Sequence, residues 1–218
     1  MLRGVADGTR GAQRQWAIRT ARDRRDARTR TLLLDAAEAV FARRGYARTT
    51  VADITGEARL SRASFYVYFA SKEEVFRELA VRARDAFLAA QEIPGVDVDD
   101  AHALAEATVA AFLDAYVAHL PLLGLIEQQA PVDDLVQAVW QEIQERPMHR
   151  MARYVRRLVG EGKAAPAAAP LAVARAVAGM NARFAQLIAE SPRERDQAVR
   201  DLTAMYLHLL GVPPRGRK

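Results

Sequence analysis

The chain contains no cysteine, and this absence excludes several kinds of chemistry. Disulfide bonds, thiol nucleophiles and zinc-thiolate centres all need the missing side chain. Nowhere do about 18 apolar residues follow one another, which is the length that a membrane span needs. The N-terminus has arginines but no apolar stretch of the kind found in secretory signals. We therefore expect a cytoplasmic protein that does not enter a membrane.

Catalytic and cofactor-binding motifs are also missing. The sequence has no glycine-rich phosphate loop, no nucleophile elbow and no HExxH metal motif. Two of its four histidines, His102 and His119, fall on one predicted helix, about 25 Å apart at about 1.5 Å per residue. The acidic residues are dispersed along helices, as on solvated surfaces. We predict that the protein is not an enzyme and has no cofactor or metal.

Helix-forming sequence is present from end to end. Half of the 218 residues are apolar, and strand-like alternation is missing. These features predict an all-α fold of about nine helices, with a domain boundary where Pro94-Gly95 breaks the chain. The predicted parts are a flexible basic arm over residues 1–25, a first domain over residues 26–92 and a second over residues 93–218.

Capping signals define the helices of the first domain. A helix over residues 28–44 should end at Gly45, which favours the left-handed conformation of a helix C-terminus. Thr50 and Asp53 form a capping box for a short helix, and Ser61 can cap the next one. In the second domain the chain should restart at Pro121, because proline lacks the amide donor that a helix interior needs.

Positive charge is concentrated in the first part of the chain. Residues 1–92 contain 18 Lys and Arg against 12 Asp and Glu, whereas residues 93–218 contain 14 against 15. A basic surface attracts phosphates and releases counterions on binding, although such charge is equally compatible with a solvated surface. The arginines of residues 1–25 allow either a plain leader or an arm that enters a DNA minor groove.

The short helix that follows Ser61 carries the strongest functional signal. It begins with Arg62-Ala63-Ser64 and continues into Phe65-Tyr66-Val67-Tyr68-Phe69. Polar side chains therefore lie at one end and aromatic side chains at the other. A short helix with arginine, hydroxyls and tyrosines, flanked by basic segments, suits a DNA major groove.

Around the stretch from Gly45-Tyr46 to Lys72 the sequence resembles the TetR family of transcriptional regulators. The resemblance rests on Ala36-Ala37, Phe41 and Gly45-Tyr46, on Thr49-Thr50-Val51 with Ile54, and on Ser61, Phe65-Tyr66-Val67-Tyr68-Phe69 and Ser71-Lys72-Glu73-Glu74. It implies a helix-turn-helix domain followed by a helical ligand-binding and dimerisation domain. Phe41, Ile54, Phe65 and Phe69 are expected in the core. The DNA-binding residues that the resemblance implies are Arg48, Thr50, Ser61, Arg62, Ala63, Ser64, Tyr66, Tyr68 and Lys72.

Two residues depart from the family pattern. Arg59 stands where the family usually has the glycine of the turn, and a left-handed arginine costs about 1–2 kcal/mol. Gly56 lies inside the preceding short helix, where glycine costs about 1 kcal/mol. The geometry of this turn is therefore the least certain feature of the domain, while no DNA contact is removed.

The last two predicted helices have wide apolar stripes. Stripes of this width allow the pair either to pack within one subunit or to form a four-helix interface with a second copy, which we favour. The predicted interface residues are Val177, Phe184, Leu187, Leu202, Met205, Tyr206 and Leu209.

A small-molecule cavity in the second domain is implied by the resemblance. Apolar walls with a few polar groups suit a hydrophobic or amphipathic ligand, although the same residues also suit an ordinary core. The candidate wall residues are Phe112, Tyr116, His119, Leu122, Ile126, Trp140, Ile143, Met151, Asn181 and Phe184.

The expected function is that of a homodimeric repressor released from a palindromic operator by a small-molecule effector. Half-sites would lie about 34–36 Å apart, or a multiple of this distance. The alternatives are an activator of the same family, a non-specific nucleoid-type DNA-binding protein, and a helical enzyme or adaptor. Sequence preference in DNA binding distinguishes the regulators from the other classes.

Overall fold

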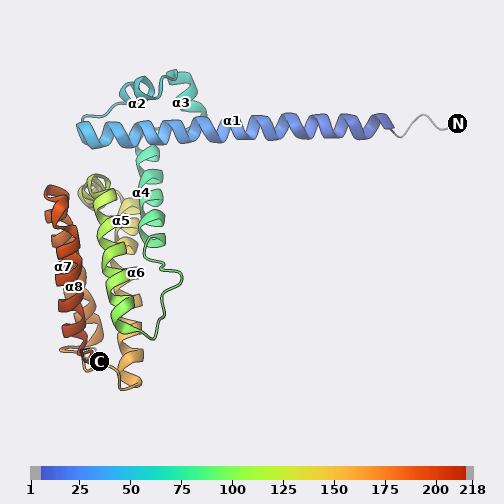
Figure 1. Ribbon diagram of the computed structural model, residues 1–218. Coiled ribbons are helices and arrows are strands. Elements are labelled where there is room, and N and C mark those ends of the chain that lie inside the picture. The colour runs from blue at the N-terminus through green and yellow to red at the C-terminus, as the bar shows by residue number, and fades with distance from the viewer. Residues whose placement is uncertain (1–5, 215–218) are drawn as a thin grey trace. The chain divides into compact units, whose positions relative to one another are not determined.

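The structure, a computed structural model, describes residues 6–214, and its side chains are described from Asp23 onward. Within these residues it contains eight α-helices and two short 3-10 turns and no strand, which confirms the all-α prediction (Figure 1). The chain divides into two compact units between Leu79 and Ala80. We call them the N-terminal unit and the C-terminal unit. This division lies inside a helix, whereas the sequence predicted a boundary at Pro94-Gly95.

The N-terminal unit is built from three helices and the beginning of a fourth. The first helix begins at Ala6, so the segment predicted as a flexible arm is helical from that residue, and residues 1–5 lie outside the described part. Alanine, arginine and glutamine are good helix formers and no proline interrupts them. The helices are α1 (Ala6–Arg44), α2 (Val51–Ala58), α3 (Arg62–Tyr68) and α4 (Lys72–Ala89), the last of which continues into the C-terminal unit.

Aromatic side chains fill the core of the N-terminal unit. Phe41 and Phe65 are completely buried, and Phe69 and Phe76 are 2% exposed. The rings of Phe41 and Phe76 meet edge to face, with 5.5 Å between their centroids. Ile54 of α2 is also completely buried. The predicted core positions of Phe41, Ile54, Phe65 and Phe69 are therefore confirmed.

The C-terminal unit contains four long helices that pack along one another (Figure 1). α5 packs against α7 and α8, and α6 packs mainly against α7. By length and composition alone, residues 101–132 would be apolar enough to cross a membrane, but the contacts of α5 are those of a core helix. The elements are α5 (Ala101–Gln129), η1 (Ala130–Val132), α6 (Asp134–Gly160), α7 (Pro170–Glu190), η2 (Pro192–Glu194) and α8 (Arg195–Leu210).

Two prolines lie inside these helices. The expected restart at Pro121 is wrong, because α5 runs through this residue. Leu122, Leu123 and Ile126, which follow it, are all buried, and their packing holds the turn that has lost a hydrogen bond. Pro147 lies inside α6 in the same way.

The loop before α7 is tied to the end of α8. The amide of Ala165 donates to the carbonyl of Gly211 at 3.2 Å, and that of Ala167 donates to Leu209 at 3.0 Å. Gly211 has a positive φ of 62°, and a Cβ atom at this position would lie 1.9 Å from the Ala165 carbonyl oxygen. Both the backbone conformation and the close approach therefore require glycine here.

Candidate DNA-binding surface and ligand cavity

The N-terminus of α2 is fixed by the predicted capping box. The Thr50 hydroxyl accepts from the Asp53 amide at 3.2 Å, and the Asp53 carboxylate accepts from the Thr50 amide at 2.9 Å. Hydrogen bonds from the Thr50 side chain and backbone, followed by the ion pair with Arg44, hold the pKa of Asp53 below its ordinary value. Thr50 remains exposed at the end of the helix.

The turn between α2 and α3 contains a strained residue. Arg59 has φ 55° and ψ 41°, and it is the one non-glycine residue with a positive φ among residues 6–214. Its amide donates to the Gly56 carbonyl at 3.2 Å, and the next amide, of Leu60, donates to Thr55 at 2.9 Å. These bonds close the helix end as a glycine would, so Arg59 adopts the left-handed conformation that the family's glycine usually supplies.

Helix α3 has one face for the core and another for solvent. Ser61 caps it by accepting from the Ser64 amide at 3.0 Å. Phe65 anchors the inner face, while Arg62 and Ala63 are exposed at the start. Arg62 forms no ion pair within the described residues, so its guanidinium is available to an external acceptor. Tyr66 and Val67 are 59% and 74% exposed.

Besides Thr50, Ser61 and Ser64, three more of the predicted DNA-binding side chains make internal hydrogen bonds. The Tyr68 hydroxyl donates to the Asp26 carboxylate at 3.1 Å, and Arg48 donates to the Arg44 carbonyl at 3.0 Å. The Lys72 ammonium donates to the Tyr46 carbonyl at 3.1 Å and lies 4.5 Å from the centre of the Tyr46 ring. An ammonium has three donors, so this bond orients Lys72 and leaves two donors for another acceptor.

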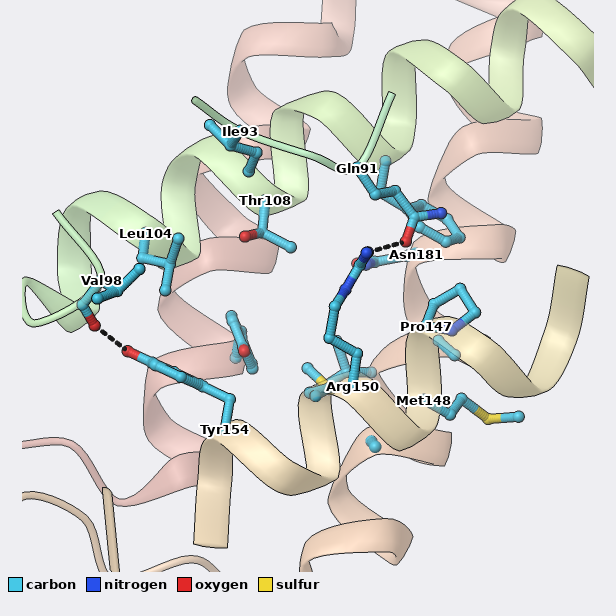
Figure 2. Close-up of a pocket in the computed structure, with 16 residues that line it drawn as sticks. Gln91, Ile93, Val98, Leu104, Thr108, Pro147, Met148, Arg150, Tyr154 and Asn181 are labelled. Carbon is cyan, nitrogen blue, oxygen red and sulfur yellow. Dashed lines mark hydrogen bonds between the residues drawn. The ribbon is translucent and has the colours of Figure 1, made fainter. Parts of the chain in front are cut away.

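A cavity of about 320 Å³ lies within the C-terminal unit (Figure 2). Most of its wall is apolar, and polar groups enter from α6, from α7 and from the beginning of the segment that follows α4. The cavity is lined by Gln91, Ile93, Val98, Leu104, Thr108, Phe112, Pro147, Met148, Arg150, Met151, Tyr154, Ala174, Val177, Ala178, Asn181 and Tyr206.

Three of the ten predicted wall residues, Phe112, Met151 and Asn181, line this cavity. Tyr116 stacks on Phe112 with 5.7 Å between ring centroids, one layer behind the wall. The remaining six are core or partly buried residues outside the lining: His119, Leu122, Ile126, Trp140, Ile143 and Phe184. Sequence reasoning missed the contribution of residues 91–98, because the Pro94-Gly95 break looked like a linker.

The predicted dimer residues fall into two groups. Val177, Leu202 and Tyr206 are 3%, 0% and 4% exposed, because α7 and α8 bury them within their own unit, so they are not available to a second copy. Val177 and Tyr206 line the cavity instead. Leu187 is 38% exposed. Phe184, Met205 and Leu209 are partly buried against the same core.

Metal-binding geometry is not found in the described part of the chain. No group of three or more His, Asp or Glu side chains there is placed to hold a metal ion. The buried polar atoms of the cavity belong to amides, which are poor sole ligands for the common protein metals.

Comparison with known proteins relates the N-terminal unit to a family of regulators. Residues 33–79 match the family model described as bacterial regulatory proteins, tetR family. A curated relative, the uncharacterized HTH-type transcriptional regulator YfiR of Bacillus subtilis (strain 168), is 29% identical over 123 residues. The match covers 56% of this chain and 56% of that relative, so the chain spans little more than half the relative's length.

Solved structures share the fold over most of the chain. A TetR-like transcriptional regulator from Rhodococcus sp. RHA1 has a TM-score of 0.64 at 23% identity, covering 83% of this chain and 94% of its own. Salmonella enterica GusR has a TM-score of 0.67 at 18% identity, covering 84% of this chain and 95% of its own. SmeT, the repressor of the Stenotrophomonas maltophilia multidrug efflux pump SmeDEF, has a TM-score of 0.62 at 24% identity, covering 86% of this chain and 94% of its own. At these identities the likeness concerns the fold.

Proposed function

We propose that the chain is a member of the TetR family of bacterial regulatory proteins, whose family model matches residues 33–79, and that it is a sequence-specific, DNA-binding transcriptional regulator. In this proposal it acts in the cytoplasm as a homodimer on a palindromic operator. The observation that carries it is the division of α3, in which Phe65 is buried in the core while Arg62 and Ala63 are exposed at its N-terminal end.

The proposed DNA contacts follow from the chemistry at each position. Arg62 suits guanine O6 and N7, which accept two hydrogen bonds in the major groove. Thr50, at the N-terminus of α2, suits a phosphate, because helix N-termini favour anions. Tyr66 and Lys72 suit phosphates on either side of the recognition helix and position the domain without reading sequence. The two classes of residue should therefore respond differently to substitution.

Selection of bound sequences from a random DNA pool tests this proposal. We expect a palindromic site with half-sites about 34–36 Å apart, or a multiple of this distance. Arg62→Ala should relax the preference at one or two positions of each half-site by about 1–3 kcal/mol. The double variant Tyr66→Phe, Lys72→Ala should weaken binding to all sequences alike. A pool that is bound without preference would instead indicate a nucleoid-type protein.

We further propose that the protein is a repressor released by a small molecule bound in the cavity of the C-terminal unit. The cavity provides a largely apolar site with a few polar groups, as small-molecule sites do. The fold is shared with SmeT, which is a repressor. A ligand releases DNA only to the extent that it prefers the conformation that binds DNA poorly.

A reporter gene placed behind the selected operator separates repression from activation. Expression should rise when the gene for the protein is deleted and should fall when it is restored. The opposite response would identify an activator of the same family. An unchanged response, with specific binding intact in vitro, would remove the proposed role at that operator.

A further inference from the structure

The cavity has a distinct polar end. The Gln91, Arg150 and Asn181 side chains gather at one side of it, whereas Val98 and Leu104 lie at the other (Figure 2). Gln91 and Asn181 are 7% and 5% exposed, so water has little access to their amide groups. This end of the cavity is where a ligand's polar group would be recognised.

Two amide atoms at this end have no hydrogen-bond partner. They are Nε2 of Gln91 and Oδ1 of Asn181. A buried polar atom without a partner costs about 1–3 kcal/mol. Such atoms are rare in proteins unless water or a ligand satisfies them, so two of them in one cavity point to a ligand.

The orientation of the Gln91 amide is fixed by its neighbour. Nη2 of Arg150 donates to Oε1 of Gln91 at 2.7 Å, which leaves Nε2 as the end that offers a donor to the cavity. If the amide were flipped, Nε2 of Gln91 would face Nη2 of Arg150, and both of these atoms are donors. No hydrogen bond fixes the amide of Asn181, so it can present either its oxygen or its nitrogen to a bound group.

Arg150 is the one charged residue in the cavity lining. Its guanidinium reaches into the cavity from α6, and its only hydrogen bond within the described residues goes to Gln91. Although Arg150 is an exposed residue, partial desolvation lowers its pKa, while the Glu92 carboxylate acts in the opposite direction. No Asp or Glu lines the cavity, so no negative charge in the lining would balance the charge of a cationic ligand.

From these contacts we infer that the cavity binds an amphipathic monocarboxylate. Its carboxylate accepts from Arg150 and from Nε2 of Gln91, with the Asn181 amide as a third partner, and its apolar body lies against Ile93, Leu104 and Met151. Charge-assisted bonds of this kind are the strong ones, and a guanidinium matches the geometry of a carboxylate. This inference rests on the proposed ligand-released function and specifies the effector's chemical class.

Calorimetric titration of the full-length protein with matched probes tests the inference. One set consists of decanoate, decanamide and decylamine, and a second of 4-phenylbutyrate and 4-phenylbutanamide, so that each carboxylate has a neutral partner with the same apolar body. We expect at least one carboxylate to bind about tenfold or more tightly than its amide, as expected for a charge-assisted bond. The amine should bind least. If no carboxylate binds more tightly than its amide, or if the amine binds best, the inference is overturned.

Substitutions at the polar end of the cavity test whether the carboxylate binds there. Arg150→Gln should weaken carboxylate binding about tenfold or more, and leave amide binding within about threefold. Gln91→Glu should also weaken it, because the new carboxylate would pair with Arg150. The matched control is Arg153→Gln, which removes a positive charge from the same helix outside the cavity and should change little. Equal losses in Arg150→Gln and Arg153→Gln would show a general charge effect and overturn the inference.

The same probes, added to a complex with operator DNA, separate the inference from the function on which it rests. A carboxylate that binds through Arg150 without changing DNA affinity would support the inferred ligand class and refute ligand-released repression. Release of DNA by an amide or amine, with carboxylates inert, would support ligand-released repression and refute the inferred class.

Discussion

Both units of the chain cap helices with nearby polar side chains, but they differ in their buried polar groups. In the N-terminal unit, hydroxyls and carboxylates satisfy nearby backbone groups, as at Thr50 with Asp53 and at Ser61 with Ser64. In the C-terminal unit, Gln91 and Asn181 keep buried polar atoms without partners around a cavity. A surface that must present fixed side chains to DNA benefits from complete local bonding, whereas a site for a small molecule retains groups that the molecule will satisfy.

The largest expected effect tests whether the N-terminal unit depends on its closely packed core. Phe41→Ala should lower the free energy of unfolding by about 3–5 kcal/mol, because it leaves a cavity in a fully buried aromatic cluster. Phe112→Ala, the control, should cost less because Phe112 is partly exposed and already faces a cavity. Chemical denaturation followed by circular dichroism measures both. Equal losses would contradict the difference in packing between the units.

In the strained turn between α2 and α3, a substitution should raise the free energy of unfolding instead of lowering it. Arg59→Gly should raise the free energy of unfolding by about 1–2 kcal/mol, because glycine adopts a positive φ without the clash of a Cβ atom. The matched control is Gly45→Ala, where φ is 75° and a Cβ would meet no atom within 4 Å, so any loss there comes from the backbone alone. Thermal melting of both variants checks the pair. A less stable Arg59→Gly would mean that the arginine side chain contributes more than its backbone conformation costs.

A smaller effect is expected at the cavity. Asn181→Leu should raise the free energy of unfolding by about 1 kcal/mol, because an apolar group of similar size replaces a buried acceptor without a partner. The same substitution should weaken the binding of any ligand that uses the amide. Thermal melting without ligand and calorimetry with decanoate measure the two quantities. A loss of both stability and binding would indicate that Asn181 is structural.

The smallest effect concerns pH and the cap of α2. The pKa of Asp53 is lower in the folded protein than its ordinary value of 3.8, chiefly through the hydrogen bond from the Thr50 side chain. A lowered pKa stabilises the fold above the ordinary value, and this contribution is lost as pH falls through the folded pKa. The difference in unfolding free energy between the wild type and Asp53→Asn should therefore shrink as pH falls from 7 to below about 4. A difference that stays constant with pH would contradict the role of the Asp53 charge.

How far the sequence predicts these features depends on the range of the interactions. The caps at Thr50 and Ser61 were predictable because each depends on residues three positions away, whereas the conformation of Arg59 was left open. The residues that carry the family resemblance, from Ala36 to Glu74, lie within the range that the family model matches, residues 33–79. Local signals of this kind fix most of the N-terminal unit.

Features that depend on distant contacts were not predictable. The continuation of α5 through Pro121 depends on the burial of the residues that follow it. Gln91 enters the cavity through a hydrogen bond to Arg150, 59 positions away. Val177 and Tyr206 lie on apolar stripes that suit an interface, and only the packing of the unit shows that the stripe faces inward. Periodicity identifies an apolar face and does not identify what covers it.

The path of α4 has a consequence for the design of fragments. Val75, Phe76 and Leu79 are buried before the division, and Ala83 and Phe87 are buried after it. A fragment that stopped at Leu79 would end in mid-helix and leave its last four carbonyls without amide partners. A stand-alone recognition domain for spectroscopy or crystallography should therefore extend to Ala89, with Phe87 changed to a polar residue to keep the new surface from aggregating.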